Sequence, residues 1–374
     1  MLRCPVMLPK VQCAPSEFVG ISLMQKLSKT TIVDIAKASG VSVSTVSRIL
    51  NDKPDVAEAT RRHVLEVIEA RGYTRQAQWQ QLAAGKSHVI SIHYPRRLEG
   101  FNYASMDFIT GATAACEEQH YSLNLITKPL DTNRLLGLYS SMRTDAMILM
   151  EILATDWRVE LLRTHQLPFV MIGRCNDNTG ISYVDIDFEG AVITSVDHLV
   201  ALGHRYIGFL AAAPNGAQLD YSPALRSLES YRAMCSQYGL PALFRETNLE
   251  LETIREAIRN LLAEQPLTAL VTMDGTASVR LAQAIQSLNL AIPGDVSVVG
   301  TVANEVAELT TPPLTTINPL GYAIGYEAGK MLIEHVEGHV SDTNQVLMPV
   351  QLIVRGSTGP VRRDVREQIE QSKD

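Results

Sequence analysis

The pattern of apolar and polar positions changes character twice along the 374-residue chain. Residues 1–29 show no periodicity. From Thr31 onward, apolar residues follow the spacing of helices, with about 3.6 residues per turn. From His88 onward, short β-rich runs alternate with amphipathic helical runs, which is typical of βαβ units and parallel sheets. The pattern predicts a small all-α head followed by an α/β body.

The first predicted helix has clear ends. Thr31 and Asp34 form a start like a capping box, with Asp in place of the usual Glu. Gly40 ends the helix, because glycine adopts the left-handed conformation of a C-cap without steric cost. Its apolar positions are Ile32, Ile35 and Ala36.

Two further helices follow closely. Ser42 caps the second, and the third stops at Gly72. The third has Ala57 where a Ser or Thr cap is usual, which costs about 1 kcal/mol and is partly offset by Glu58 near the helix start. The predicted apolar stripes are Val43, Val46 and Leu50 in the second helix and Val64, Val67 and Ile68 in the third.

The body carries seven clear strand candidates, separated by helical runs. The run YVDIDFEGAVITSVDHLVALGHRYIGFL, residues 183–210, marks the point where one α/β unit passes to a second. The fold expected is thus two parallel-sheet subdomains. The strand candidates are residues 88–94, 121–128, 145–150, 168–173, 206–212, 268–273 and 296–302.

These patterns divide the chain into five segments. A start at Met24 would remove most of the first segment, so residues 1–23 are expected to be disordered or not translated. The linker is polar with helical propensity, and the charged tail reads as a short exposed helix or a frayed end. The segments are an N-terminal extension (1–29), the head (30–73), the linker (74–87), the body (88–359) and the tail (360–374).

Charge is distributed unevenly. Residues 26–87 carry ten Lys/Arg and six Asp/Glu, a net +4, whereas residues 88–374 carry 21 and 33, a net −12. A basic head on an acidic body indicates that only the head meets a polyanion. Chance clustering is the alternative.

The five cysteines are scattered, with no CxxC pair. This argues against a disulfide framework or a cysteine zinc site and fits a reducing cytosol. No apolar run reaches the 18 residues typical of a membrane span, and the N-terminus lacks the apolar core of a signal peptide. A cytoplasmic protein without membrane association, metal or cofactor is expected.

The stretch GVSVSTVSRILN, residues 40–51, points to DNA. Two helices joined by a short turn, the second bearing small hydroxyl residues and Arg48, fit a helix-turn-helix whose second helix enters the major groove. Arginine is the commonest reader of guanine, and Ser and Thr hydroxyls suit phosphate contacts. A surface helix with a polar face is the alternative.

The sequence resembles the lactose-repressor/galactose-repressor (LacI/GalR) family of bacterial transcription regulators. The head carries TIVDIAKASGVSVSTVSRILN (31–51) and TRRHVLEVIEARGY (60–73). The body carries LGHRYIGFL (202–210), IPGDVSVVG (292–300) and PPLTTI (312–317). The resemblance covers nearly the whole chain after residue 29.

This resemblance implies roles for residues of the head and linker. A homodimer would bind a pseudo-palindromic operator in double-stranded DNA, and Leu82 of the linker would wedge into the minor groove. Trp79 stands where the family usually has alanine, so it either alters the groove contact or packs against the core. The implied base readers are Val43, Ser44 and Arg48; the implied phosphate contacts are Thr31, Ser42, Thr45, Ser47 and Asn51, with Tyr73 packing near the linker.

The body resembles the periplasmic sugar-binding architecture, with an effector cleft between two subdomains. Two expected sugar contacts are displaced. VVGTVANE has Val302 where the family has a sugar-binding aspartate, and the family's effector-binding arginine falls on Ser227, one place after Arg226. The effector is then a sugar held by other groups or a different small metabolite, or ligand control is lost. The candidate contacts are Asp274, Arg226, Tyr103 and Asn304, with Asp274 equally able to cap a helix.

The resulting hypothesis is a ligand-responsive transcriptional repressor. The alternative is a small-molecule or sugar-binding receptor without DNA function. An enzyme ranks third, because no nucleophile elbow, P-loop, GxGxxG or HExxH motif occurs. A dimer is favoured over a tetramer, because the tail lacks a leucine heptad.

Overall fold

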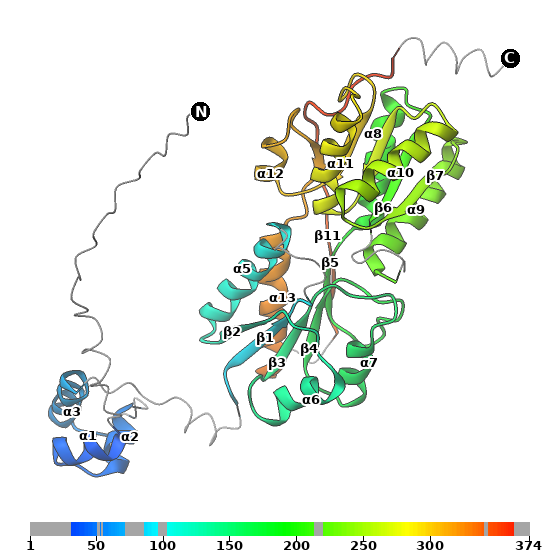
Figure 1. Cartoon of the computed structure of the whole chain (residues 1–374). Helices are drawn as coiled ribbons and strands as arrows, with labels where there is room; N and C mark the ends of the chain where they lie inside the picture. Colours follow the sequence, from blue (N-terminus) through cyan, green and yellow to red (C-terminus); the bar gives the residue numbers. More distant parts are fainter. Residues whose placement is uncertain are drawn as a thin grey trace, which may run out of the picture. The chain divides into compact units, whose positions relative to one another are not determined.

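The computed structural model divides into two compact units, one within residues 1–83 and one within residues 84–374. The first holds the helical head and the second holds the α/β body (Figure 1). Each unit is described by itself. The residues described are 31–50, 53, 55–71, 86–95, 103–212, 220–339 and 343–362, with only the main chain at positions 103 and 104.

The head consists of α1 (Ile32–Ser39), α2 (Val43–Leu50) and α3 (Glu58–Ala70). The predicted capping box is confirmed: the Asp34 N–H donates to Thr31 Oγ1 at 3.3 Å, and Asp34 Oδ2 accepts from the Thr31 N–H at 2.8 Å. Gly40 ends α1 in the left-handed conformation, with φ 67°. At the start of α3 no side chain caps the helix, as expected from Ala57.

The buried face of α2 differs from the predicted stripe. Val46 and Ile49 are buried, whereas Val43 is 42% exposed and Leu50 is half-buried. At about 100° per residue, Val46 and Ile49 lie about 60° apart, and Val43 lies about as far from Val46 on the other side. The face centred between Val46 and Ile49 packs against α1 and α3, which leaves Val43 on the exposed side.

The first subdomain is built on a six-stranded parallel sheet with strand order β11-β5-β4-β3-β1-β2. Its side chains alternate between two helical layers. In β3, Ile148 faces the cluster that includes α5 and α13, whereas Met147 and Leu149 face the cluster that includes α6 and α7. The elements are β1 (Val89–His93), α5 (Tyr103–Glu118), β2 (Ser122–Ile126), α6 (Thr132–Ser140), β3 (Ala146–Leu149), α7 (Trp157–Thr164), β4 (Phe169–Ile172), β5 (Tyr183–Ile186), α13 (Gly321–Val336) and β11 (Gln345–Met348).

The second subdomain has a similar sheet, ordered β12-β10-β9-β8-β6-β7, in which only β12 runs antiparallel to its neighbour. Its four central strands are fully buried, as is typical of parallel strands covered on both faces. The elements are β6 (Ile207–Ala212), β7 (Leu243–Thr247), β8 (Ala269–Thr272), β9 (Ser297–Thr301), β10 (Thr315–Ile317), β12 (Leu352–Ile353), α8 (Phe188–Ala201), α9 (Ser222–Tyr238), α10 (Leu251–Glu264), α11 (Gly275–Ser287) and α12 (Asn304–Glu308).

The chain passes between the subdomains three times. The passage predicted within residues 183–210 is confirmed, because β5 belongs to the first sheet and β6 to the second. After β10 the chain returns, so that α13 and β11 complete the first subdomain before β12 joins the second sheet. The two subdomains are therefore not consecutive segments of the sequence.

The return of α13 depends on close helix packing. Gly325 of α13 lies against the main chain of Phe108 in α5, where a Cβ atom would overlap the Phe108 carbonyl oxygen. Gly111 of α5 lies as close to the main chain of Tyr322. Small residues at both positions let the two helices approach across their backbones.

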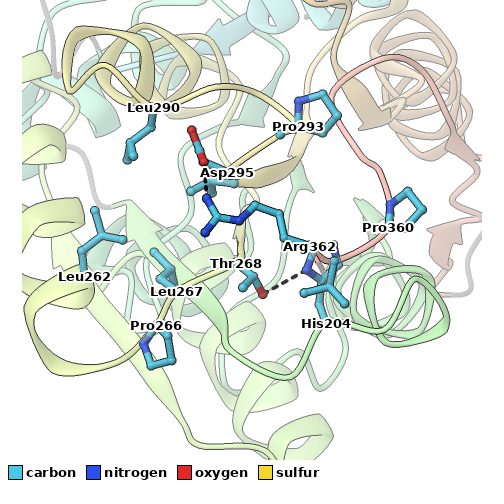
Figure 2. Close-up of a pocket in the computed structure, with 13 residues that line it drawn as sticks. His204, Leu262, Pro266, Leu267, Thr268, Leu290, Pro293, Asp295, Pro360 and Arg362 are labelled. Atoms are coloured by element: carbon cyan, nitrogen blue, oxygen red, sulfur yellow. Dashed lines mark hydrogen bonds and ion pairs between the residues drawn. The ribbon is translucent and has the colours of Figure 1, made fainter. Parts of the chain in front are cut away.

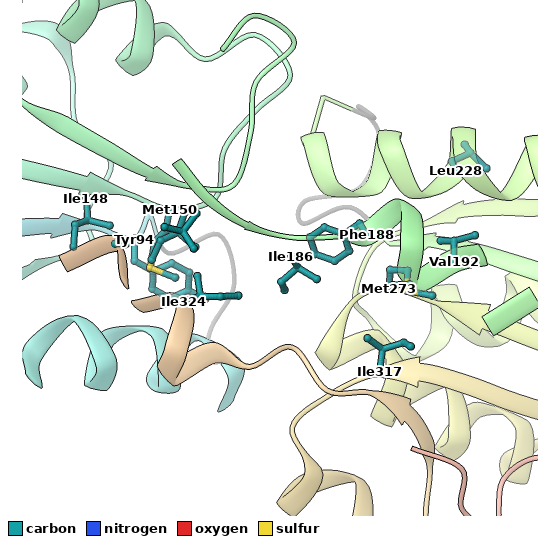
Figure 3. Packing of buried hydrophobic residues seen from close by; sticks show 14 of the residues in the cluster. Tyr94, Ile148, Met150, Ile186, Phe188, Val192, Leu228, Met273, Ile317 and Ile324 are labelled. Carbon is teal, nitrogen blue, oxygen red and sulfur yellow. The ribbon is translucent and has the colours of Figure 1, made fainter. Parts of the chain in front are cut away.

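One apolar cluster includes residues of both subdomains. Figure 3 shows Tyr94, Met150 and Ile324 on the side of the first subdomain, and Phe188 and Met273 on the side of the second. All five are buried. Among the described residues, no helix combines the length and apolar character needed to cross a bilayer.

Candidate nucleic-acid interface and effector cleft

The hydroxyl groups at the start of α2 bond to one another. Ser42 Oγ accepts the Thr45 N–H at 3.1 Å, which is the predicted helix cap. It also lies 2.7 Å from Ser44 Oγ and 2.8 Å from Thr45 Oγ1. Ser42 and Ser44 are exposed and Thr45 is half-buried. The start of α2 therefore presents a polar surface of small donors and acceptors.

Arg48 lies on the same helix and is exposed. Its guanidinium pairs with the carboxylate of Asp55, a residue that the sequence alone did not mark as important. Its Nε donates to Asp55 Oδ1 at 3.3 Å, and a second nitrogen contacts Asp55 Oδ2. Asp55 stands seven residues further on, outside the helix. Because both side chains are about half exposed, the pair is of the surface kind, which contributes little stability.

Several predicted residues lie outside the described part of the chain. They are Asn51, Tyr73, Trp79 and Leu82, together with the N-terminal extension and the side chain of Tyr103. The last residues of the predicted linker are described: the N–H and hydroxyl of Ser87 donate to Asp145 Oδ1 at 2.6 and 2.8 Å. These bonds attach residue 87 to the body.

A small cavity lies at the carboxyl ends of β6 and β8, where ligands of parallel sheets bind. Its volume of about 10 Å³ fits one water-sized group. The first turns of α9 and α11 close it from the side. The lining residues are Phe209, Leu210, Ala211, Ala212, Tyr221, Pro223, Ala224, Ser227, Met273 and Asp274.

Two polar side chains of this lining differ in their bonding. Ser227 is fully buried, and its hydroxyl has no hydrogen-bond partner among the residues that the structure describes. Asp274 caps α11, since its Oδ1 accepts the Ala277 N–H at 2.8 Å, and burial raises the pKa of its carboxyl. An unsatisfied buried hydroxyl is costly, so Ser227 is the group of this lining with unmet bonding capacity.

The other predicted effector contacts have partners within the protein. Arg226 forms ion pairs with Asp185 at 2.7 Å and Glu189 at 3.2 Å. Asn304, at the start of α12, accepts a hydrogen bond from Arg355 Nη2 at 2.9 Å. Of the four predicted contacts, Asp274 lines the cavity, Arg226 and Asn304 do not, and the Tyr103 side chain is not described.

The VVGTVANE segment supplies core contacts. Val302 is 3% exposed within the second apolar cluster of the body, and its N–H donates to Thr316 Oγ1 at 2.9 Å. Thr301 is buried as well, with its hydroxyl 3.1 Å from Met273 Sδ. The side chains at positions 301 and 302 are therefore packed in the core rather than open to a ligand.

A larger cavity of about 200 Å³ lies at the amino ends of β6, β8 and β9, away from the first cavity (Figure 2). His204 lines this cavity, with Nδ1 3.0 Å from Thr268 Oγ1 and Nε2 3.0 Å from the Gly359 carbonyl oxygen. Burial lowers the His204 pKa to about 4. Both ring nitrogens of this histidine are engaged within the protein, so it is a structural hydrogen-bonding residue. Arg362 pairs with Asp295 at 2.7 Å beside the same cavity.

A helix-turn-helix head joined to a body of two α/β subdomains is the architecture of a class of DNA-binding proteins. Residues 31–76 match the family described as "Bacterial regulatory proteins, lacI family". Residues 196–358 match the "Periplasmic binding protein-like domain". The chain is 31% identical to "HTH-type transcriptional regulator MalR" of Streptomyces coelicolor over 343 residues, which cover 88% of this chain and 96% of that protein. The chain belongs to the LacI family, whose members are transcriptional regulators and not enzymes.

Other relatives support this assignment. Catabolite control protein A of Priestia megaterium is 26% identical over 88% of this chain and 99% of its own length. Among solved structures, the Lac repressor dimer bound to operator and the anti-inducer ONPF has a TM-score of 0.77 at 24% identity, covering 88% of this chain and 99% of that one. A CelR–cellobiose complex has a TM-score of 0.66 at 23% identity, covering 87% and 99%. These structures share the fold.

Proposed function

We propose that this protein is a transcriptional repressor whose operator affinity is controlled by a small neutral, hydroxyl-bearing effector bound between the two body subdomains. The observation that carries the proposal is the cavity at the carboxyl ends of β6 and β8, with the unsatisfied Ser227 hydroxyl and the Asp274 carboxyl in its wall. A ligand hydroxyl that donates to one group and accepts from the other would satisfy both.

The DNA contacts proposed are those of the exposed face of α2. Val43, Ser44 and Arg48 would meet base edges, because all three are exposed. Arg48 must first leave Asp55, which costs little for a surface pair. Hydroxyl groups at the helix start would hold phosphates, and a homodimer would bind both halves of a pseudo-palindrome in the cytoplasm. The proposed phosphate contacts are Thr31, Ser42, Thr45, Ser47 and Asn51, with Trp79 and Leu82 in the minor groove.

The effector class follows from the charges of the cavity wall. The described lining residues include one carboxylic acid and no Lys, Arg or His. A sugar phosphate or an organic acid would meet Asp274 without a compensating cation, and burying such a charge is costly. A neutral sugar would place a single hydroxyl group there, which matches the small size of the cavity. Two features of relatives agree: CelR was solved with cellobiose, and one Lac repressor structure contains ONPF.

The DNA-binding half of the proposal is tested by selecting a fragment from random duplex DNA and titrating salt. Phosphate contacts give a linear fall of log affinity with log salt. We expect the Arg48→Ala substitution to weaken the free energy of DNA binding by about 1–3 kcal/mol and to relax specificity at one base per half-site. Thr45→Ala is the matched control on the same helix, and it should weaken binding to all DNA sequences by the same factor. Absence of any selected sequence would favour a receptor without DNA function.

The effector half is tested by thermal shift of the full chain against neutral mono- and disaccharides, sugar phosphates and organic acids. We expect a neutral sugar to raise the melting temperature and Ser227→Ala to reduce the shift. A response confined to anionic ligands would overturn the assigned effector class.

A further inference from the structure

Two segments from different subdomains are joined by an isolated antiparallel bridge beside the cavity. Residues 152–154 follow β3 of the first subdomain, and residues 220–222 lead into α9 of the second. The Ala154 N–H donates to the Asp220 carbonyl at 2.7 Å, and the Ser222 N–H donates to the Ile152 carbonyl at 3.2 Å. Leu153 and Tyr221 lie opposite each other as an antiparallel bridge. We call this pairing the latch.

A buried arginine holds the first half of the latch in shape. Arg158 of α7 is 3% exposed, and its Nη2 donates to the Met150 and Glu151 carbonyls at 3.1 and 3.0 Å. Glu151 has a φ of 55°, in the left-handed region that non-glycine residues seldom occupy. Asp156 pairs with Arg158 at 2.6 Å and accepts the Leu153 N–H at 3.2 Å. These bonds fix a strained loop at the position the latch requires.

A second set of charges holds the other half. Arg226 Nε donates to Ser222 Oγ at 3.2 Å, and its other nitrogens reach Asp185 at 2.7 Å and Glu189 at 3.2 Å. Arg174 pairs with the same two carboxylates at 3.0 and 2.8 Å. Arg174 follows β4 and Asp185 belongs to β5, both in the first subdomain, whereas Glu189 and Arg226 belong to helices of the second. The four charges therefore join the subdomains.

The latch and the cavity share one segment. Tyr221, which forms the bridge, also lines the cavity, as do Ala224 and Ser227 on the first turns of α9. A ligand group placed beside Ser227 would therefore lie next to Tyr221, a residue of the latch. A displacement of this segment would break the backbone bonds of Ala154 and Ser222 together.

We propose that the latch is the element that reports effector occupancy: it stabilises the closed arrangement of the subdomains, and effector binding changes its population. This inference rests on the proposed function, because it assigns the regulation of the same cleft. A ligand shifts such an equilibrium only through contacts that differ between the two states. Tyr221 would supply such a contact, because it lines the cavity and forms the bridge of the latch. Arg226 is a positioning residue for the latch.

The first test is hydrogen exchange of the full chain. Arg226→Gln removes the ion pairs to Asp185 and Glu189, and we expect amide exchange to rise about tenfold in peptides that cover 150–156 and 219–224. Arg232→Gln is the matched control, because Arg232 lies on the same helix but stacks on Phe244, 4.6 Å from its ring centre. Unchanged exchange in both peptides of Arg226→Gln would overturn the assignment of Arg226.

The second test locks the latch. Leu153→Cys with Tyr221→Cys places two cysteines at a non-hydrogen-bonded antiparallel pair, where Cα atoms lie about 4.5 Å apart, within disulfide range. The reduced form of the same variant is its own control. We expect oxidation to change the dissociation constant for the selected operator fragment at least fivefold.

The outcomes of this second test separate the two proposals. Equal affinities of the oxidised and reduced forms would refute the regulatory role of the latch. Failure of the wild-type chain to select any DNA would instead refute the proposed function, while the exchange experiment would still decide whether the latch forms.

Discussion

Acidification should destabilise the body through His93, a buried histidine of β1. His93 is 2% exposed. Its Nδ1 accepts from Arg158 Nη1 at 3.1 Å, and its Nε2 donates to the Lys128 carbonyl at 3.3 Å. Burial, together with the neighbouring Arg158 charge, lowers the His93 pKa from 6.5 to about 4. The folded protein therefore holds this ring neutral in a pH range where the unfolded chain protonates it.

The sign and size follow from this difference in pKa. The unfolded state binds more protons between pH 6.5 and about 4, so stability is fully present above pH 6.5 and falls as pH decreases through that window. Each pH unit within it is worth about 1.36 kcal/mol. Between pH 7 and pH 5 the loss attributable to His93 is therefore about 2 kcal/mol.

The assay is urea unfolding of the full chain at pH 7 and pH 5, followed by the fluorescence of Trp157, which adjoins Arg158 at the start of α7. His93→Gln should lower stability at pH 7 but make the loss between the two pH values about 2 kcal/mol smaller than in the wild type. Ser91→Ala is the matched control, because Ser91 is a buried residue of the same strand that does not titrate. An identical loss in His93→Gln and wild type would refute the reasoning.

Three further outcomes are expected. Asp55→Ala should tighten operator binding by at most about fivefold, because Arg48 no longer leaves a surface ion pair; weaker binding in an anisotropy titration would contradict this. Gly325→Ala should cost about 1–3 kcal/mol in urea unfolding, because the new Cβ overlaps the Phe108 carbonyl. Val302→Asp should cost several kcal/mol in the same assay, because an unpaired carboxylate would enter an apolar cluster; a small effect would mean that the site admits water.

Most of the local structure follows from the sequence, because local signals and tertiary packing agree. The capping box at Thr31, the left-handed Gly40 and all seven predicted strands of the body are present in the structure. Fully buried parallel strands give apolar runs that are hard to mistake. Five strands of the described part of the chain are not among the seven candidates. β7, β11 and β12 lie at sheet edges, and the buried strands β5 (YVDI) and β10 (TTI) are short and interrupted by polar residues.

Long-range topology did not follow from the pattern. The sequence pattern of Gly321–Val336 indicates a helix, but it does not indicate which of the two sheets that helix covers. Its glycines at 325 and 329 indicate close packing, yet only the structure shows that the partner is α5. The returns of α13 and β11 to the first subdomain depend on such contacts between residues far apart in sequence.

The buried charges explain why the effector contacts were the least predictable part. The resemblance to the LacI/GalR family implies that Arg226 stands near the effector cleft, where an arginine could contact a ligand. Whether it is available depends on carboxylates about 40 residues away in sequence, at positions 185 and 189. Because two arginines meet two carboxylates, the cluster is neutral as it stands. An anionic ligand could attract Arg226 only by leaving the buried Asp185 carboxylate with Arg174 as its single partner, which removes part of the charge that offsets its burial.

The same charge balance bears on the proposed response to an effector. With Arg174 and Arg226 engaged in joining the subdomains, the proposed recognition falls to Ser227, Asp274 and the apolar wall around them. In that proposal, those groups would distinguish ligands by hydroxyl placement and shape. The charged cluster would act on a different quantity, namely the free-energy difference between two arrangements of the subdomains. Substitutions in the cluster should therefore change how strongly operator binding responds to effector, while substitutions in the cavity wall should change which effector binds.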